Sequence, residues 1–404
     1  MSAPAIELAD IVRRFGEAYL ARYRATTSWH QLRVLLDIAR CRTAAMGGHV
    51  EVCPECGLVQ NAYNSCRNRH CPKCLGSARQ RRAAAREAEL LPVHYFHVVF
   101  TLPAEVAALA HANPRLVYDV LFKAAAGALS DVAADPTHLG AKIGFIAVLH
   151  TWGQKLDHHP HVHCLVPGGG LSPNGEQWIA ARPEFFLPVR VLSRVFRGKC
   201  LDLLTQAVDD GRLQHRGGRR ALRRRLVRAS RHEWVVYAKP PFGGPVQVVR
   251  YLARYTHRVA IANHRLVGLA DGRVTFRYKD YADGNQVKTM SLPAVQFLRR
   301  FMTHVLPPSF IRIRHYGFLA NRDRDRHIAL CRAALDAAPV PLPPTMPDAA
   351  ELPHDPEPSN PADPLERARC PACHIGLMRV LVRHDRPLLA PTIPTVPQLV
   401  WNTS

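Results

Sequence analysis

Residues 150–170, HTWGQKLDHHPHVHCLVPGGG, decide how the middle of this chain is expected to fold. His161 and His163 flank Val162 in a stretch that reads as a β-strand. The two-residue period of a strand points both imidazoles to the same face of a sheet. Since the two rings share a face, they can bind one metal ion, and the sequence predicts a sheet that carries a metal site.

The segment before this strand offers a third ligand. Ile146, Val148 and His150 share one parity in the run IGFIAVLH, and the ten residues between His150 and His161 leave room for a turn. His150 is the first candidate for the third ligand, and Gln154 is the second. A lone histidine on a strand is usually structural, but the clustering here favours a metal site. Imidazoles suit zinc, manganese and other transition ions better than magnesium, so the ion's identity stays open.

Strand and helix patterns surround this segment. The runs HYFHVVFTLP, EWVVYAK, RVTFRYK and FIRIRHY read as strands, and residues 116–132, 192–207 and 246–259 read as helices. This mixture predicts an α+β fold with a central, mainly antiparallel sheet flanked by helices. The charge run RGGRRALRRRLVR at 216–228 is either a solvated helix face or a phosphate contact.

The predicted helix 246–259 carries a second motif of chemical interest. Gly243-Gly244-Pro245 is a good helix entry, and Tyr251 and Tyr255 are four residues apart, hence neighbours on one face. A phenol has an ordinary pKa of about 10, so a tyrosine nucleophile needs an electrophile that a metal ion and cations have polarised. Core packing is the alternative for Tyr255, but the combination with the histidine strand favours phosphodiester transfer. Three cationic residues are candidates for DNA binding: Arg254, Arg258 and Lys239.

Two CxxC motifs precede the histidine strand. Cys53-Pro-Glu-Cys56 and Cys71-Pro-Lys-Cys74 are separated by fourteen residues, a spacing that predicts four thiolates converging on one structural Zn²⁺. So short a segment has too little apolar surface to fold without an ion. Cys66 and His70 lie in the same block, which leaves open a shifted ligand set or a second site.

A further CxxC motif lies near the C-terminus. Cys370-Pro-Ala-Cys373-His374 is half of a zinc ribbon. It is either a weak or partial zinc site, which would use His384, or a remnant that binds no metal.

The composition limits the class of protein. The 404 residues carry 54 Lys and Arg against 32 Asp and Glu, a net charge of +22 that indicates a polyanionic partner. No stretch has the roughly 18 uncharged apolar residues of a membrane span, and the N-terminus does not read as a secretory signal. A soluble, cytoplasmic protein without a membrane partner is expected. Its eleven cysteines would stay reduced, as metal ligands or buried side chains.

These patterns divide the chain into five expected parts. A helical segment occupies 1–50, and a zinc-binding module with a connector helix occupies 51–91. The catalytic domain covers 92–335. A proline-rich linker at 336–368 precedes the CxxCH tail at 369–404.

Taken together, the motifs resemble the transposases of the insertion sequence 91 family, which are bacterial rolling-circle transposases. The similarity covers most of residues 5–335 and includes the runs CRTAAMGGHVEVCPECG, NSCRNRHCPKC, YFHVVFTLP, HTWGQKLDHHPHVHCLVPGGGLS and YLARYTHRVAIAN. It implies an HUH-type single-strand DNA endonuclease domain, with His161 and His163 as metal ligands and Tyr251 and Tyr255 as paired nucleophiles. It also assigns four cysteines to a zinc-binding N-terminal domain: Cys53, Cys56, Cys71 and Cys74.

The resemblance implies a reaction as well. Single-stranded DNA at a transposon end would be nicked with a catalytic Mg²⁺ or Mn²⁺, leaving a 5′-phosphotyrosine and a free 3′-hydroxyl, and the second tyrosine would serve the transfer to target DNA. Three alternatives stay open: a zinc-dependent nucleic-acid-binding regulator without catalysis, a relaxase or plasmid replication initiator, and a hydrolase whose ion activates water.

Overall fold

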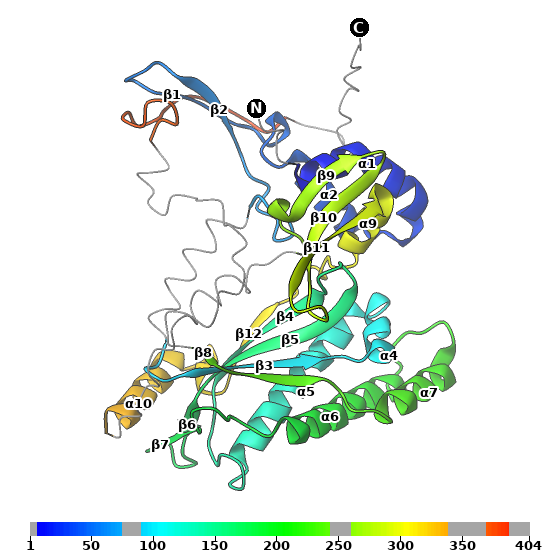
Figure 1. Cartoon of the computed structure of the whole chain (residues 1–404), viewed down its shortest axis with the longest axis vertical. Coiled ribbons are helices and arrows are strands. Elements are labelled where there is room, and N and C mark those ends of the chain that lie inside the picture. Colours follow the sequence, from blue (N-terminus) through cyan, green and yellow to red (C-terminus); the bar gives the residue numbers. More distant parts are fainter. Residues whose placement is uncertain (1–5, 75–89, 243–259, 338–368, 388–404) are drawn as a thin grey trace.

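A five-stranded antiparallel sheet forms the centre of the computed structural model, which describes residues 6–74, 90–242, 260–337 and 369–387 (Figure 1). The strand order is β12-β4-β5-β3-β8, and each neighbouring pair is antiparallel. The strands are β3 (Tyr95–Thr101), β4 (Phe145–Trp152), β5 (His158–Pro167), β8 (Val236–Phe242) and β12 (Ile313–Tyr316). The predicted α+β fold with an antiparallel sheet flanked by helices is confirmed.

One face of this sheet is covered by long helices. Val162, Cys164 and Val166 of β5 are completely buried in a cluster that includes residues of α5 (Pro114–Ala134) and α6 (Val189–Asp209). Two further helices complete this layer: α4 (Ala104–Ala107) and α7 (Gly218–Ser230). The alternation along β5 therefore reserves the odd-numbered residues for the other face.

The other face is apolar along only part of β5. There Leu165 packs with Ile146 and Val148 of β4 and with Ile328 of α10 (Arg324–Ala337). A short hairpin of β6 (Gly169–Leu171) and β7 (Trp178–Ala180) lies beside α10. Further along the same face of β5, the apolar residues give way to His163 and His161. The sequence thus leaves a polar site on an otherwise packed sheet face.

A second core joins segments that are distant in sequence. The helices α1 (Leu8–Tyr23) and α2 (Trp29–Arg40) pack with α9 (Ala294–Met302) and with the sheet of β9 (Leu266–Ala270), β10 (Arg273–Asp280) and β11 (Gln286–Pro293) (Figure 1). Ser28 begins α2 as an N-cap that accepts from the Gln31 amide. The strand RVTFRYK was expected in the central sheet. It is β10 of this second sheet instead, because Val274 and Phe276 are completely buried in the second core.

A third, small sheet brings together the two ends of the described chain. β1 (Gly48–Val52) lies between β2 (Val59–Tyr63) and β13 (Arg379–His384), in the order β13-β1-β2 (Figure 1). The tail strand β13 thus pairs with the N-terminal cysteine segment. The sequence alone predicts that the tail is a separate part of the chain. In the described ranges, five short 3-10 helices connect other elements: Arg24–Thr26, Ala44–Met46, Ala108–His111, Asn263–Arg265 and Gly317–Leu319.

The expected helices at 80–91 and 246–259 and the linker at 336–368 lie wholly or mostly outside the described residues. Among the helices that the structure does describe, none has the length and apolar character needed to cross a membrane.

Candidate metal centre and cysteine clusters

Three histidines meet on the open part of the sheet. His150 of β4 is the register partner of His161 of β5, and His163 stands two residues further along β5. The ligand atoms of the three imidazoles all lie within 4.8 Å of one another. His150 is buried and packs against Trp152 at 4.7 Å between ring centroids. The structure therefore brings together the three residues that the sequence singles out as metal ligands.

Hydrogen bonds orient the two β5 imidazoles. The Nδ1 of His161 lies 2.6 Å from the carbonyl oxygen of His159, and since a carbonyl can only accept, this Nδ1 carries the proton. The lone pair of His161 is then on Nε2. Burial lowers the pKa of His161 to about 4, so its ring is neutral near pH 7. A neutral imidazole with an oriented lone pair is what metal coordination requires.

A fourth histidine, which the sequence analysis missed, supports the cluster. His97 of β3 is buried, and its Nε2 lies 2.7 Å from the Nδ1 of His163, with the rings stacked 5.0 Å apart. If His163 donates its Nδ1 proton to His97, the Nε2 of His163 is left to coordinate an ion. The sequence contained an indication of this role, because the predicted strand HYFHVVF carries His97. The structure shows that this strand is β3 and that it pairs with β5.

Other histidines and Gln154 near the cluster have different partners. His158 points to the opposite face, where its Nε2 lies 3.0 Å from the hydroxyl of Tyr118 on α5. Gln154 donates from its side-chain amide to the Tyr281 hydroxyl at 3.1 Å, so it faces the second sheet. Among the residues that the structure describes, three imidazoles thus form the donor set, and their chemistry fits a transition ion such as Mn²⁺ or Zn²⁺ better than Mg²⁺.

The remaining candidates of the predicted catalytic site have little or no structural description. Tyr251, Tyr255, Arg254 and Arg258 lie outside the described residues. The backbone of Lys239 belongs to β8 and pairs with His97.

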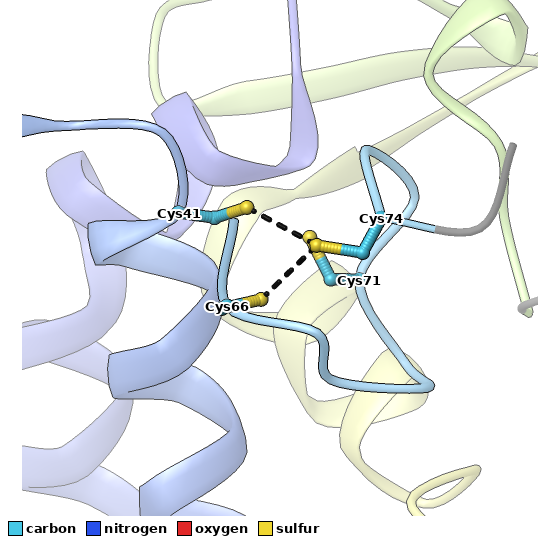
Figure 2. A group of neighbouring side chains, drawn as sticks. All are labelled: Cys41, Cys66, Cys71 and Cys74. Carbon is cyan, nitrogen blue, oxygen red and sulfur yellow. Dashed lines mark hydrogen bonds between the residues drawn. The ribbon is translucent and has the colours of Figure 1, made fainter. Parts of the chain in front are cut away.

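Figure 2 shows the first cysteine cluster, in which Cys41, Cys66, Cys71 and Cys74 converge. The Sγ of Cys74 lies 3.3 Å from that of Cys41 and 3.4 Å from that of Cys66. Tetrahedral zinc with Zn–S bonds of about 2.3 Å places its sulfurs about 3.8 Å apart, so the four thiols fit a zinc site closely. The thiols of Cys66 and Cys71 lower the pKa of Cys41, and the other three thiols lower the pKa of Cys74, so these two cysteines ionise most readily in the cluster.

The four cysteines predicted to share one ion are not together in the structure. Cys53 and Cys56 lie with Cys370 and Cys373 of the tail, as a second cluster. Cys71 and Cys74 instead meet Cys66, which the sequence left open as an alternative ligand, and Cys41, which it did not consider. Cys41 joins this cluster because α2 ends at Arg40, so that Cys41 lies directly after the helix and beside the second CxxC turn.

His70 belongs to neither cluster. Its Nε2 accepts a hydrogen bond from the Leu306 amide at 3.1 Å, and its Nδ1 lies 3.1 Å from the side-chain oxygen of Asn68. Burial, with Arg69 and Arg312 nearby, lowers the pKa of His70 to about 3. This imidazole is therefore a neutral structural link between the cysteine segment and the loop after α9.

Comparisons with known proteins agree with this arrangement. Residues 11–102 match a family described as "Transposase zinc-binding domain", and residues 144–326 match one described as "Putative transposase". A "Putative transposase y4qJ" of Sinorhizobium fredii is 51% identical over 98% of this chain and 98% of its own length. The "Transposase for insertion sequence element IS801" of Pseudomonas savastanoi pv. phaseolicola is 29% identical over 78% of this chain and 76% of its own length.

One solved structure was also compared, the metal-free conjugative relaxase TrwC in complex with oriT DNA. The alignment covers 61% of this chain and 73% of the relaxase chain. It has 14% sequence identity and a TM-score of 0.23, a likeness too weak to carry an argument.

The two family matches and the two similar proteins identify the chain as a transposase. The chain belongs to the insertion sequence 91 family of transposases. The match to a zinc-binding domain and the two cysteine clusters support bound Zn²⁺.

Proposed function

We propose that this transposase cuts and joins single-stranded DNA at the histidine centre, with Tyr251 and Tyr255 as nucleophiles. The observation that carries the proposal is the meeting of His150, His161 and His163 on two neighbouring strands. A divalent ion held there, Mn²⁺ or Mg²⁺, would polarise the phosphate that is cut. The imidazole donor set favours Mn²⁺ of the two.

The chemistry assigned to the tyrosines is a phosphoryl transfer. The phenol oxygen of one tyrosine forms a bond to the phosphorus, and the bond from phosphorus to the 3′ oxygen breaks. The 3′ oxygen leaves as a hydroxyl after it takes up a proton, and the tyrosine keeps the 5′-phosphate. The attack of another 3′-hydroxyl on this phosphotyrosine reverses the step and joins two strands. Two tyrosines allow the two transfers of a rolling-circle transposition without ATP.

Basic residues are proposed to hold the DNA at transposon ends and at the target. Arg254, Arg258 and Lys239 are candidates near the reacting phosphate. A second surface is the exposed side of α7, which is rich in arginines. Since α7 packs with α6 on the face of the sheet opposite the histidines, it would bind phosphates away from the cut.

We place these activities within the parts expected from the sequence. Residues 92–335 would carry the nicking and transfer steps. The module at 51–91 would recognise DNA or serve as architecture, since its cysteines are suited to structural zinc.

The experiment that tests the proposal is a covalent-adduct assay. Single-stranded oligonucleotides that carry the element ends are incubated with the protein and Mn²⁺ or Mg²⁺, and a denaturation-resistant protein–DNA band is sought. His161→Ala combined with His163→Ala should abolish the band yet leave DNA affinity nearly intact, because affinity comes from basic groups and stacking. His138→Ala, an exposed histidine after α5, is the matched control and should behave like the parent.

The tyrosines are tested in the same assay. The Tyr251→Phe and Tyr255→Phe double variant removes two hydroxyls and keeps both rings, so it should bind DNA and form no adduct. Each single variant should retain some adduct but fail in complete transposition. An adduct that persists in the double variant, or that maps to Tyr278 or Tyr281, would refute the proposed nucleophiles.

A further inference from the structure

We propose that the C-terminal tail completes a second structural zinc site, in which Cys53 and Cys56 of the N-terminal module and Cys370 and Cys373 of the tail bind one ion. The Sγ atoms of Cys53 and Cys373 are 3.7 Å apart, and those of Cys56 and Cys370 are 3.5 Å apart. A disulfide needs about 2.05 Å, whereas the sulfurs around a tetrahedral zinc are about 3.8 Å apart. The spacing is that of metal ligands. The tail lies outside both regions that match transposase families.

The two CxxC turns of this site have matching backbones. In the first, the Gly57 amide donates to the Cys53 carbonyl at 3.0 Å, and in the second the His374 amide donates to the Cys370 carbonyl at 3.0 Å. The fourth residue after the first cysteine is left-handed in both turns, with φ of +72° at Gly57 and +57° at His374. Two segments more than 300 positions apart therefore form the same tight turn and present their thiols to one point.

Backbone amides of the tail point at its thiols. The Ala372 amide donates to the Sγ of Cys370 at 3.4 Å, and the Gly376 amide donates to the Sγ of Cys373 at 3.5 Å. Such N–H···S bonds stabilise thiolates, which are the form that binds zinc. Gly376 also fits closely over the site, because a Cβ at this position would lie 2.5 Å from the Sγ of Cys53.

Apolar packing does not account for the position of the tail. Within residues 48–63 and 369–387, all of which the structure describes, the buried residues are two glycines and two cysteines: Gly48, Cys53, Cys370 and Gly376. The apolar side chains of β13 are open to solvent, and Leu381 and Val382 are 58% and 53% exposed. A three-stranded sheet without an apolar core is unstable by itself, so a bound ion would add to the strand pairing that holds β13 against β1.

The experiment is residue-resolved alkylation of the full-length protein purified with zinc. Thiols that bind zinc react slowly with an alkylating reagent, and mass spectrometry reports each cysteine separately. In the parent, the cysteines of both clusters should be protected. In the Cys370→Ser and Cys373→Ser double variant, Cys53 and Cys56 should become reactive, while the cluster of Cys41 should stay protected. Elemental analysis after mild chelation should find one zinc fewer per chain.

The reciprocal variant and a matched control complete the design. Cys53→Ser with Cys56→Ser should expose the tail thiols and lose the same single zinc, and combining all four substitutions should lose no more. The control, Ala372→Ser with Ile375→Ser, alters the tail turn without a thiol and should keep both ions.

Two outcomes would overturn the proposal. One is that Cys53 and Cys56 stay protected when the tail thiols are replaced. The other is that Cys53→Ser with Cys56→Ser exposes Cys71 and Cys74, which would mean that the two N-terminal CxxC motifs share an ion. In the tail variant, protection of the Cys41 cluster shows that the protein has folded. In the variant of Cys53 and Cys56, an unchanged circular dichroism spectrum shows it.

Discussion

The imidazole of His97 is proposed to position a ligand without touching the ion. Its hydrogen bond to the Nδ1 of His163 fixes the tautomer that coordinates through Nε2. His97→Phe should therefore raise the Mn²⁺ concentration for half-maximal nicking by about 10- to 100-fold. The rate at saturating Mn²⁺ should change much less.

A conservative variant separates this role from packing. His97→Gln keeps a hydrogen-bond acceptor and should recover part of the metal affinity. Equal metal affinity in His97→Phe and the parent, at unchanged thermal stability, would show that His97 does not orient His163.

The buried imidazole of His70 links stability to pH. Its pKa is about 3 in the folded protein and about 6.5 in an unfolded chain, so folding holds it neutral. The stability that this neutrality contributes is complete above pH 6.5 and declines as pH falls toward 3, because the unfolded state then binds the extra proton. Between pH 7.5 and 5.5 the loss from this group should be about 1 kcal/mol.

Urea unfolding at the two pH values measures this effect. His70→Gln removes the titrating ring, so its free energy of unfolding should fall less between pH 7.5 and 5.5 than that of the parent. His138→Gln, at an exposed position, is the control and should leave the difference unchanged. Identical pH dependence in all three proteins would contradict the role of His70.

At the scale of one element, α7 is an amphipathic helix with an unusually basic exterior. Leu222, Leu226 and Ala229 are buried at helical spacing, so the arginines between them face solvent. Arg223 pairs with Asp209, whereas, in the part of the chain that the structure describes, several others have no ion pair: Arg219, Arg220, Arg224 and Arg228. An uncompensated arginine surface of this kind is suited to a phosphate backbone.

Salt dependence measures the contacts of α7. If Arg220 and Arg224 each bind a phosphate, changing both to Gln should reduce the slope of log affinity against log salt by about 1.4 for single-stranded DNA. Nicking at saturating DNA should be unchanged, since α7 lies on the far face of the sheet. The same change at Arg322 and Arg326, near the start of α10, is the charge-matched control. If the slope is unaltered in the α7 variant, Arg220 and Arg224 do not bind phosphates and only face solvent.

The elements that the sequence predicted well are those with local signals. Period-two alternation located β3, β4 and β5, and the shared face of His161 and His163 followed from the same period. The sequence did not predict which elements or cysteine pairs meet when they are far apart in the chain. Nothing in the local spacing separates a CxxC pair that meets its neighbour from one that meets a tail 300 residues away. The strand pattern of β10 likewise carries no information about which sheet it joins.

For the whole molecule, the second core joins the two regions of the chain that match transposase families. Cys41 and Cys71 are buried in the same cluster as Val274 and Phe276 of β10 and Phe297 of α9. The zinc-binding match at 11–102 and the transposase match at 144–326 therefore share one hydrophobic core. A substitution in the first cysteine cluster should therefore lower the local stability of the sheet of β9, β10 and β11, which lies more than 190 residues later in the chain.

Hydrogen exchange can measure this coupling. Cys71→Ser should release zinc and speed amide exchange in residues 266–302 by about tenfold or more, the effect of roughly 1.4 kcal/mol of lost local stability. Exchange in α5 should change little. Cys200 is a buried thiol of α6 in the first core. Cys200→Ser should therefore speed amide exchange in α5 and change it little in residues 266–302. If Cys71→Ser leaves residues 266–302 unaffected, the two matched regions are energetically independent.

The pairing of β13 with β1 also sets an order of events during synthesis. The strand β13 follows β2 by more than 300 residues, so β1 pairs with β2 on one side and keeps its other edge unpaired until that later segment has been synthesised. A chain that stops early, even one with an intact histidine centre, would lack the third strand of its first sheet. The pairing therefore separates chains that have reached residue 384 from those that have not, by a sheet edge that is covered in one and open in the other.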